Sequence, residues 1–125
     1  MRMRVFNGVV VVKGHVWGPT ADGDVRLIVD TGAAYTALGR RVLRLSGYDL
    51  TDLRDSVAIT TATRVEQWAR INVERFGVLG ELRSNFPVLA QDLPLAARVD
   101  GLLGLDFFAG HKLCLDLSEG TLELI

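Results

Sequence analysis

The stretch that decides the fold is LIVDTGA, at residues 27–33. Its apolar part, residues 27–29, is typical of a strand covered on both faces, and it leads directly to Asp30. A carboxylate at the end of a buried strand is unusual, because burying it without hydrogen-bond partners costs free energy. The hydroxyl of Thr31 and the unobstructed backbone N–H of Gly32 can supply such partners. Taken alone, the tripeptide Asp-Thr-Gly favours an ordinary turn.

A second segment changes that interpretation. VDGLLGL, at residues 99–105, follows about seventy residues later. Together, in this order and at this spacing, the two segments resemble the two active-site signatures of the pepsin and retropepsin clan of aspartic proteases. The alternating segments at 113–117 and 121–124 also resemble the closing strands of bacterial and retroviral-like members. The resemblance covers nearly the whole chain.

The resemblance implies a single lobe of mostly β structure spanning residues 1–125. In this family the strands form a closed β-barrel, with one or two short helices and a flap hairpin over the active site. The second signature is expected to loop across the active-site strand and then enter a short helix. Its residues in this chain are Gly101, Leu102, Leu103 and Gly104.

The resemblance also implies aspartic endopeptidase activity with Asp30 as the catalytic residue. The clan's chemistry needs two carboxylates about 3 Å apart that share one proton. This chain contains Asp-Thr-Gly only once, so a homodimer is expected in which each subunit supplies one Asp30. Thr31 is expected to hydrogen-bond across the dimer axis, Gly32 to bring its N–H to the carboxylate, and Ala33 to match the retroviral motif.

The flap is expected at the tip of a hairpin within residues 57–73. This tip departs from the family pattern, because it contains neither the glycines of retroviral flaps nor the tyrosine of pepsin. Its residues are Thr60, Thr61, Ala62, Thr63 and Arg64.

Glycine-rich turns between short apolar runs predict many short strands. Strands are expected at residues 9–17, 25–29, 86–90, 112–117 and 121–125, besides the flap hairpin. Asp22-Gly23 predicts a hairpin turn within 19–24. Short helices are expected at 40–45 and 101–108.

Composition excludes several classes of function. A formal net charge of -1 gives no field for gathering nucleic acid or an anionic membrane. The longest apolar run, residues 9–12, is too short to span a bilayer, and no signal peptide is visible, so a cytoplasmic location is expected. Cys114 is expected to be a buried core thiol. His15 and His111 form no metal-ligand pattern, so neither a metal nor a cofactor is expected.

Other polar and aromatic residues have plainer interpretations than catalysis. Asp22 and Asp100 precede glycine and are expected to form turns. Asp24 follows the first of these turns, and Asp116 is expected on the polar side of an alternating strand. Tyr35 and Trp68 are expected in the core more often than in a substrate groove. The arginines at 40, 41 and 44 are expected on a solvated helix face.

Two functions of different class remain open from the sequence. The first is an endopeptidase that binds an extended peptide between the flap and the active site. The alternative is a retropepsin-fold module for dimerisation or peptide binding with little or no proteolysis. The domain could also belong to a longer parent chain. Residues 121–125 are expected to hold the dimer, with Leu122 and Leu124 facing outward unless a second chain covers them.

Overall fold

The computed structural model describes residues 3–6, 8–51, 55–93 and 98–125. The protein is mostly β, with two short helices, as the sequence predicts. The helices are α1 (Arg40–Leu45) and α2 (Leu105–Phe108). The strands are β1 (Arg4–Phe6), β2 (Val9–Trp17), β3 (Asp22–Val29), β4 (Ala37–Leu38), β5 (Ser56–Thr60), β6 (Val65–Val78), β7 (Glu81–Ala90), β8 (Gly101–Leu103), β9 (Leu113–Asp116) and β10 (Thr121–Leu124).

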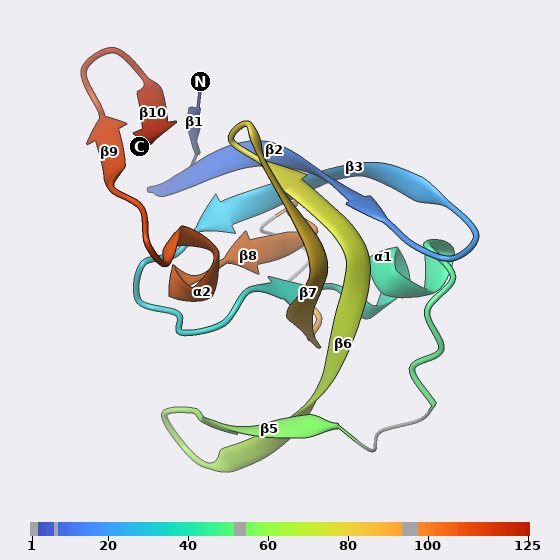
Figure 1. Cartoon of the computed structure of the whole chain (residues 1–125). Helices are drawn as coiled ribbons and strands as arrows, with labels where there is room; N and C mark the ends of the chain where they lie inside the picture. The colour runs from blue at the N-terminus through green and yellow to red at the C-terminus, as the bar shows by residue number, and fades with distance from the viewer. Residues whose placement is uncertain (1–2, 7, 52–54, 94–97) are drawn as a thin grey trace.

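Six strands pair into a closed ring (Figure 1). Around it run β2, β3, β8, β4, β7 and β6, and a further pairing between β6 and β2 completes the circuit. The expected closed architecture is therefore present. β5 pairs only with the first half of β6, and the two project from the ring as a hairpin (Figure 1). β9 and β10 form a separate two-stranded sheet near β1.

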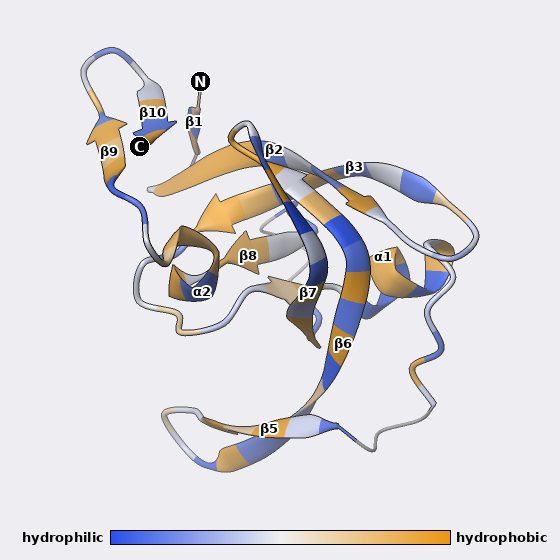
Figure 2. Cartoon of the chain, viewed as in Figure 1, coloured by the Kyte–Doolittle hydropathy of each residue, from blue (hydrophilic) through white to orange (hydrophobic). Residues whose placement is uncertain are grey.

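The core fills the inside of this ring. Phe76, Phe86 and Phe107 meet there with ring centroids 5.7–5.8 Å apart, in stacked and edge-to-face pairs. Leu27 of β3 and Leu103 of β8 are completely buried beside them. The hydropathy of β6 alternates along the strand, as expected when one face covers the core and the other meets solvent (Figure 2).

The predicted turn at Asp22-Gly23 is wrong. These residues lie in β3, in register with Trp17 and Val16 of β2, and the turn lies at residues 18–21. Gly18 donates its N–H to the Ala21 carbonyl at 2.9 Å. A side chain on Gly18 would collide with the backbone of Ser46, so contact with the end of α1 requires glycine at the turn.

The predicted helix at 101–108 is only half correct. Residues 101–103 form β8, which pairs in parallel with β3 and antiparallel with β4, and the helix begins at Leu105. Glycine is required at position 101, where β8 lies between β3 and β4, because a Cβ on Gly101 would collide with the Ala37 carbonyl. Pairing on both sides overrides the helical interpretation of the apolar run.

The closing strands differ in detail from the expectation. Leu122 is buried within its own subunit, and Leu124 packs against the core. The exposed apolar side chains of the C-terminal hairpin are instead Leu115, Leu117 and Ile125. Cys114 is half-buried in β9 rather than in the core.

Candidate active site

Asp30 lies immediately after β3, where the strand ends in a tight loop. Its backbone N–H donates to the Leu103 carbonyl at 3.0 Å, so the neighbouring strand β8 fixes the position of its backbone. One carboxylate oxygen accepts the N–H of Gly32 at 3.0 Å. A Cβ on Gly32 would stand 3.3 Å from that oxygen, which is tight for a side chain. The half-buried carboxylate thus has a backbone donor, as the sequence predicts.

The neighbouring loop residues are placed differently from one another. Thr31 and Gly32 are exposed, and Ala33 is half-buried. The Ala33 N–H donates to the Asp30 carbonyl at 3.2 Å, which closes the turn. The Ala33 carbonyl accepts the N–H of Leu105 at 2.8 Å. The first and second signatures are therefore in direct contact.

Gly104 brings the second signature against this loop. A Cβ on Gly104 would meet the carbonyls of Tyr35 and Ala33 at 2.6 and 3.0 Å, so no larger residue fits here without a shift. Its N–H donates to the Thr36 hydroxyl at 3.1 Å. At the start of the segment, Asp100 accepts the Arg26 N–H at 2.8 Å and donates its own N–H to the Arg26 carbonyl. Asp100 therefore anchors the segment to β3, besides preceding a glycine.

Sequence reasoning missed the pair Thr36 and Asp106. The Asp106 carboxylate accepts the Thr36 N–H at 3.0 and 3.1 Å and the Thr36 hydroxyl at 2.7 Å. Thr36 is completely buried, and Asp106 is half-buried in the first turn of α2. The signal that points to Asp106 is its position, since it is the one charged residue in the run GLLGLDFF, residues 101–108.

The predicted flap region is a hairpin, as expected. β5 and β6 pair antiparallel, from Ser56 opposite Ala69 to Thr60 opposite Val65. The tip closes without glycine, through the Thr61 side chain. The Thr61 hydroxyl donates to the Arg64 carbonyl at 2.9 Å and accepts the N–H groups of Arg64 and Thr63 at 3.1 and 3.4 Å. A side-chain network thus replaces glycine-rich backbone.

Neither aromatic candidate lies in the core. Tyr35 is 40% exposed on the active-site loop, and Trp68 is half-buried in the hairpin. The Trp68 indole N–H donates to Glu66 at 3.0 Å, and Arg64 pairs with the other carboxylate oxygen at 2.6 Å. The Trp68 hydrogen bond, followed by the Arg64 contacts, lowers the pKa of Glu66 below its ordinary value. Glu66 therefore connects Arg64 with Trp68 near the tip of the hairpin.

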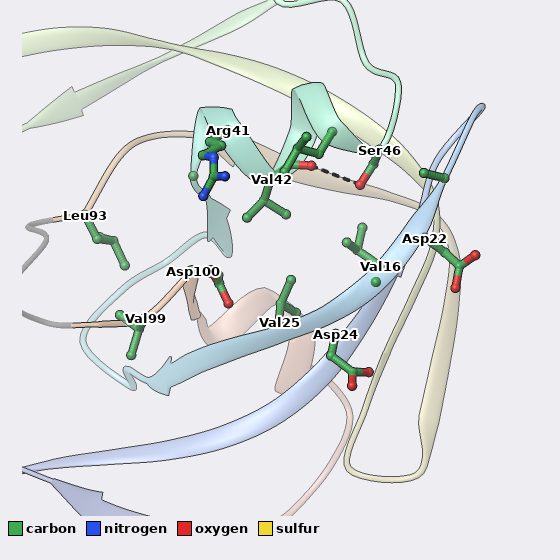
Figure 3. Close-up of a pocket in the computed structure, with 14 residues that line it drawn as sticks. Val16, Asp22, Asp24, Val25, Arg41, Val42, Ser46, Leu93, Val99 and Asp100 are labelled. Carbon is green, nitrogen blue, oxygen red and sulfur yellow. Dashed lines mark hydrogen bonds between the residues drawn. The ribbon is translucent and has the colours of Figure 1, made fainter.

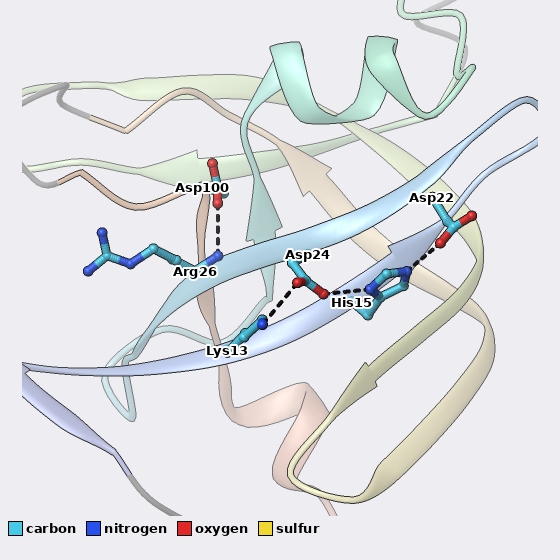
Figure 4. Close-up of polar contacts among 6 residues, drawn as sticks. All are labelled: Lys13, His15, Asp22, Asp24, Arg26 and Asp100. Atoms are coloured by element: carbon cyan, nitrogen blue, oxygen red, sulfur yellow. Dashed lines mark hydrogen bonds and ion pairs between the residues drawn. The ribbon is translucent and has the colours of Figure 1, made fainter.

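A cluster of polar side chains lies on the β2–β3 ribbon (Figure 4). His15 contacts Asp24 through Nδ1 at 2.8 Å and Asp22 through Nε2 at 2.6 Å. Lys13 pairs with Asp24 at 3.0 Å. The hydrogen bonds to Asp24 and Asp22 raise the pKa of His15, and the one from His15 is the main cause that lowers the pKa of Asp24. Asp22 and Asp24 are cross-strand partners of His15, not second catalytic acids.

A cavity of about 440 Å³ lies between the β2–β3 ribbon and α1 (Figure 3). Val16, Val25 and Val42 form part of its apolar lining. None of residues 30–36 lines it, so this cavity is separate from the Asp30 loop. The three α1 arginines are exposed, as expected, and Arg40 pairs with Asp92 at 3.4 Å.

Within the described ranges, no three His, Cys, Asp or Glu side chains come together in a way that would hold a metal ion. Neither described helix has the length and apolar character needed to cross a membrane.

Comparisons with known proteins agree with this geometry. A crystal structure of a retropepsin-like aspartic protease from Rickettsia conorii superposes with a TM-score of 0.74 at 25% sequence identity, covering 98% of this chain and 86% of that one. The retroviral protease-like domain of Ddi1 from Leishmania major gives a TM-score of 0.61 at 20% identity, covering 93% and 87% of the two chains, and shows the fold alone. No curated protein matches. A family model described as aspartyl protease matches residues 12–107, which include both signatures. The chain therefore belongs to the aspartyl protease family, with the retropepsin-like fold.

Proposed function

We propose that this protein is an aspartic endopeptidase that acts as a homodimer. The observation that carries the proposal is the Asp30 carboxylate, half-buried at the end of β3 and held by the Gly32 N–H at 3.0 Å. Its chain supplies only one Asp-Thr-Gly, and the chemistry needs two carboxylates. The second Asp30 would come from the other subunit, across a twofold axis.

In the proposed reaction, one Asp30 carboxylate takes a proton from a water molecule, whose oxygen attacks the scissile carbonyl carbon. The other Asp30, protonated, donates a hydrogen bond to the carbonyl oxygen as negative charge develops there. The tetrahedral intermediate collapses when the carbonyl re-forms and the C–N bond breaks, and the leaving nitrogen takes the proton that the first Asp30 received from water. The dyad then again holds one proton. Two carboxylates about 3 Å apart share one proton in the resting dyad, because both cannot ionise at that distance.

The remaining site residues have supporting roles in this proposal. Thr31, exposed beside Asp30, would hydrogen-bond to the other subunit, and Ala33 with Gly101–Gly104 would keep the loop in place. An extended peptide would lie between the active-site loop and the hairpin tip, residues 60–64, and pair as an added strand.

The dimer would also use the chain ends. Leu115, Leu117 and Ile125 are 42–69% exposed on the β9–β10 hairpin, and Val5 of nearby β1 is 56% exposed. Apolar side chains gathered in this way are typical of an interface, because water contact with them costs free energy that a second subunit removes.

The test is incubation of the protein with a diverse peptide mixture at acidic and near-neutral pH, read by mass spectrometry. Asp30→Asn is the control, since the amide is nearly isosteric but cannot act as a base. Cleavage by the wild type and none by the variant supports the proposal. Cleavage at the wild-type rate by the variant contradicts it.

A second candidate is a dimerisation or peptide-binding module with little proteolysis. The hairpin tip favours it, because a turn built on Thr61 differs from the glycine-rich tip of retroviral flaps. A dimer that binds an extended peptide tightly but cleaves nothing in the mixture would support this candidate instead.

A further inference from the structure

The hairpin joins the ring at one residue of β6. Arg70 is in register with Leu89 of β7. The residues of β6 that precede it, 65–69, pair with β5 instead. Arg70 therefore lies where β6 passes from the hairpin into the ring. Figure 1 shows the hairpin projecting from the ring at this end of β6. Any change in the angle between the hairpin and the ring has to act through the backbone near this residue.

An ion pair with two hydrogen bonds closes the hairpin at this point. Arg70 donates from Nε to one oxygen of Asp55 at 3.0 Å and from Nη2 to the other at 2.9 Å. The Arg70 backbone N–H also donates to the Asp55 carbonyl at 3.0 Å. A guanidinium that binds a carboxylate through two parallel bonds fixes orientation as well as distance.

The other side-chain hydrogen bonds described for the hairpin differ from this ion pair. The side-chain hydrogen bonds of Ser56, Thr61, Arg64 and Trp68 all end within the hairpin. These hydrogen bonds connect parts of the hairpin with each other and do not reach the ring. Ala69 and Ile71, on either side of Arg70 in the sequence, pack against the core, so β6 is anchored where it joins the ring.

We propose that Asp55 and Arg70 are positioning residues that set the hairpin over Asp30 and so determine how tightly a peptide substrate is held. This proposal rests on the proposed function. The pair touches no reacting atom. Breaking it lets the hairpin take more orientations, and a substrate must then select the productive one. The loss therefore appears in KM, while kcat changes little.

The size of the effect follows from exposure. The Arg70 and Asp55 side chains are 38% and 54% exposed, so water and salt screen the pair. Removing one partner is expected to raise KM by about two- to fivefold, the range typical of exposed ion pairs. Raising the ionic strength is expected to raise KM in the wild type and to have less effect in the variants.

The experiment compares Asp55→Asn, Arg70→Gln and the charge-reversed double variant D55R/R70D. Peptide cleavage gives KM and kcat for each, and hydrogen exchange of the amides at 56–69 is measured on the same proteins without substrate. Glu81→Gln is the matched control, because Glu81 forms a similar ion pair with Arg83 at 3.0 Å, near the β6–β7 turn.

The proposal predicts a raised KM and faster hairpin exchange in both single variants, recovery of both in the double variant, and wild-type values for the control. Hairpin exchange unchanged in both single variants overturns it. Equal effects of Glu81→Gln also overturn it, since the change would then reflect general loss of stability. The exchange measurement needs no catalysis, so failure of the proteolytic function and failure of this proposal are distinguishable.

Discussion

The loop that carries Asp30 and the β5–β6 hairpin are built in opposite ways. Buried contacts from distant parts of the chain hold the loop, through Thr36, Leu103 and Asp106. Contacts within the hairpin hold the hairpin, and most of its side chains are exposed or half-exposed. The loop is therefore expected to open only with the whole fold, while the hairpin moves on its own. The proposed function would use this division, because catalytic groups must stay fixed while a cover over them admits substrate.

The largest expected difference comes from truncating one aromatic residue in each region. Phe107→Ala removes a completely buried ring beneath the active-site loop and is expected to lower the free energy of unfolding by about 3–5 kcal/mol. Trp68→Ala removes a half-buried ring from the hairpin and is expected to cost about 1 kcal/mol. Urea unfolding of both variants measures the two losses. Equal losses would remove the distinction between the regions.

A smaller effect is expected from the carboxylate that holds the loop. Asp106→Ala leaves the Thr36 N–H and hydroxyl without their acceptor in a buried place, at a cost of about 1.5–3 kcal/mol. Asp116→Ala is the matched control, because Asp116 also accepts bonds from the N–H and hydroxyl of one residue, Ser118, but at the surface. Its loss is expected to stay below about 1 kcal/mol. A larger loss from Asp116→Ala would contradict this account.

These two regions also differ in how far the sequence predicts them. The sequence predicts the contact between Asp30 and Gly32, because the two signatures together, in this order and spacing, indicate one loop, and the structure has that hydrogen bond. The catalytic role of Asp30 stays a prediction. The bond between Thr36 and Asp106 spans 70 residues, so no local pattern reveals it. The sequence predicts the turn after β2 at Asp22-Gly23, because these residue types favour turns. In the structure the turn lies at residues 18–21, where Gly18 packs against the end of α1.

The smallest expected effect concerns the β2–β3 ribbon, which resembles the hairpin in its exposure. The raised pKa of His15 means that its bonds to Asp24 and Asp22 stabilise the fold fully below the ordinary value of 6.5 and are lost as pH rises through the raised value. At acidic pH, the pKa of Asp24 is lowered below its ordinary value of 3.8, so its interaction with His15 persists to below pH 3.8. Stability is therefore expected to be unaffected by this group below pH 6.5, and to fall modestly as the pH rises above 6.5 and through the raised pKa of His15.

Urea midpoints across that range measure the effect, with His15→Gln as the control. The variant keeps hydrogen-bonding ability but has no charge to lose, so its stability is expected to change less with pH. The same slope in both proteins would show that His15 is not the group responsible.

The central claim is that two copies of Asp30 make one active site, and a mixing experiment tests it most directly. Wild-type protein at a fixed concentration is mixed with a fivefold excess of Asp30→Asn, under conditions where subunits exchange and both proteins are dimeric. Random pairing leaves about one sixth of the starting wild-type pairs, so the cleavage rate is expected to fall to about one sixth. A rate that stays at its starting value would show that one subunit cleaves peptides alone, and would contradict the shared dyad.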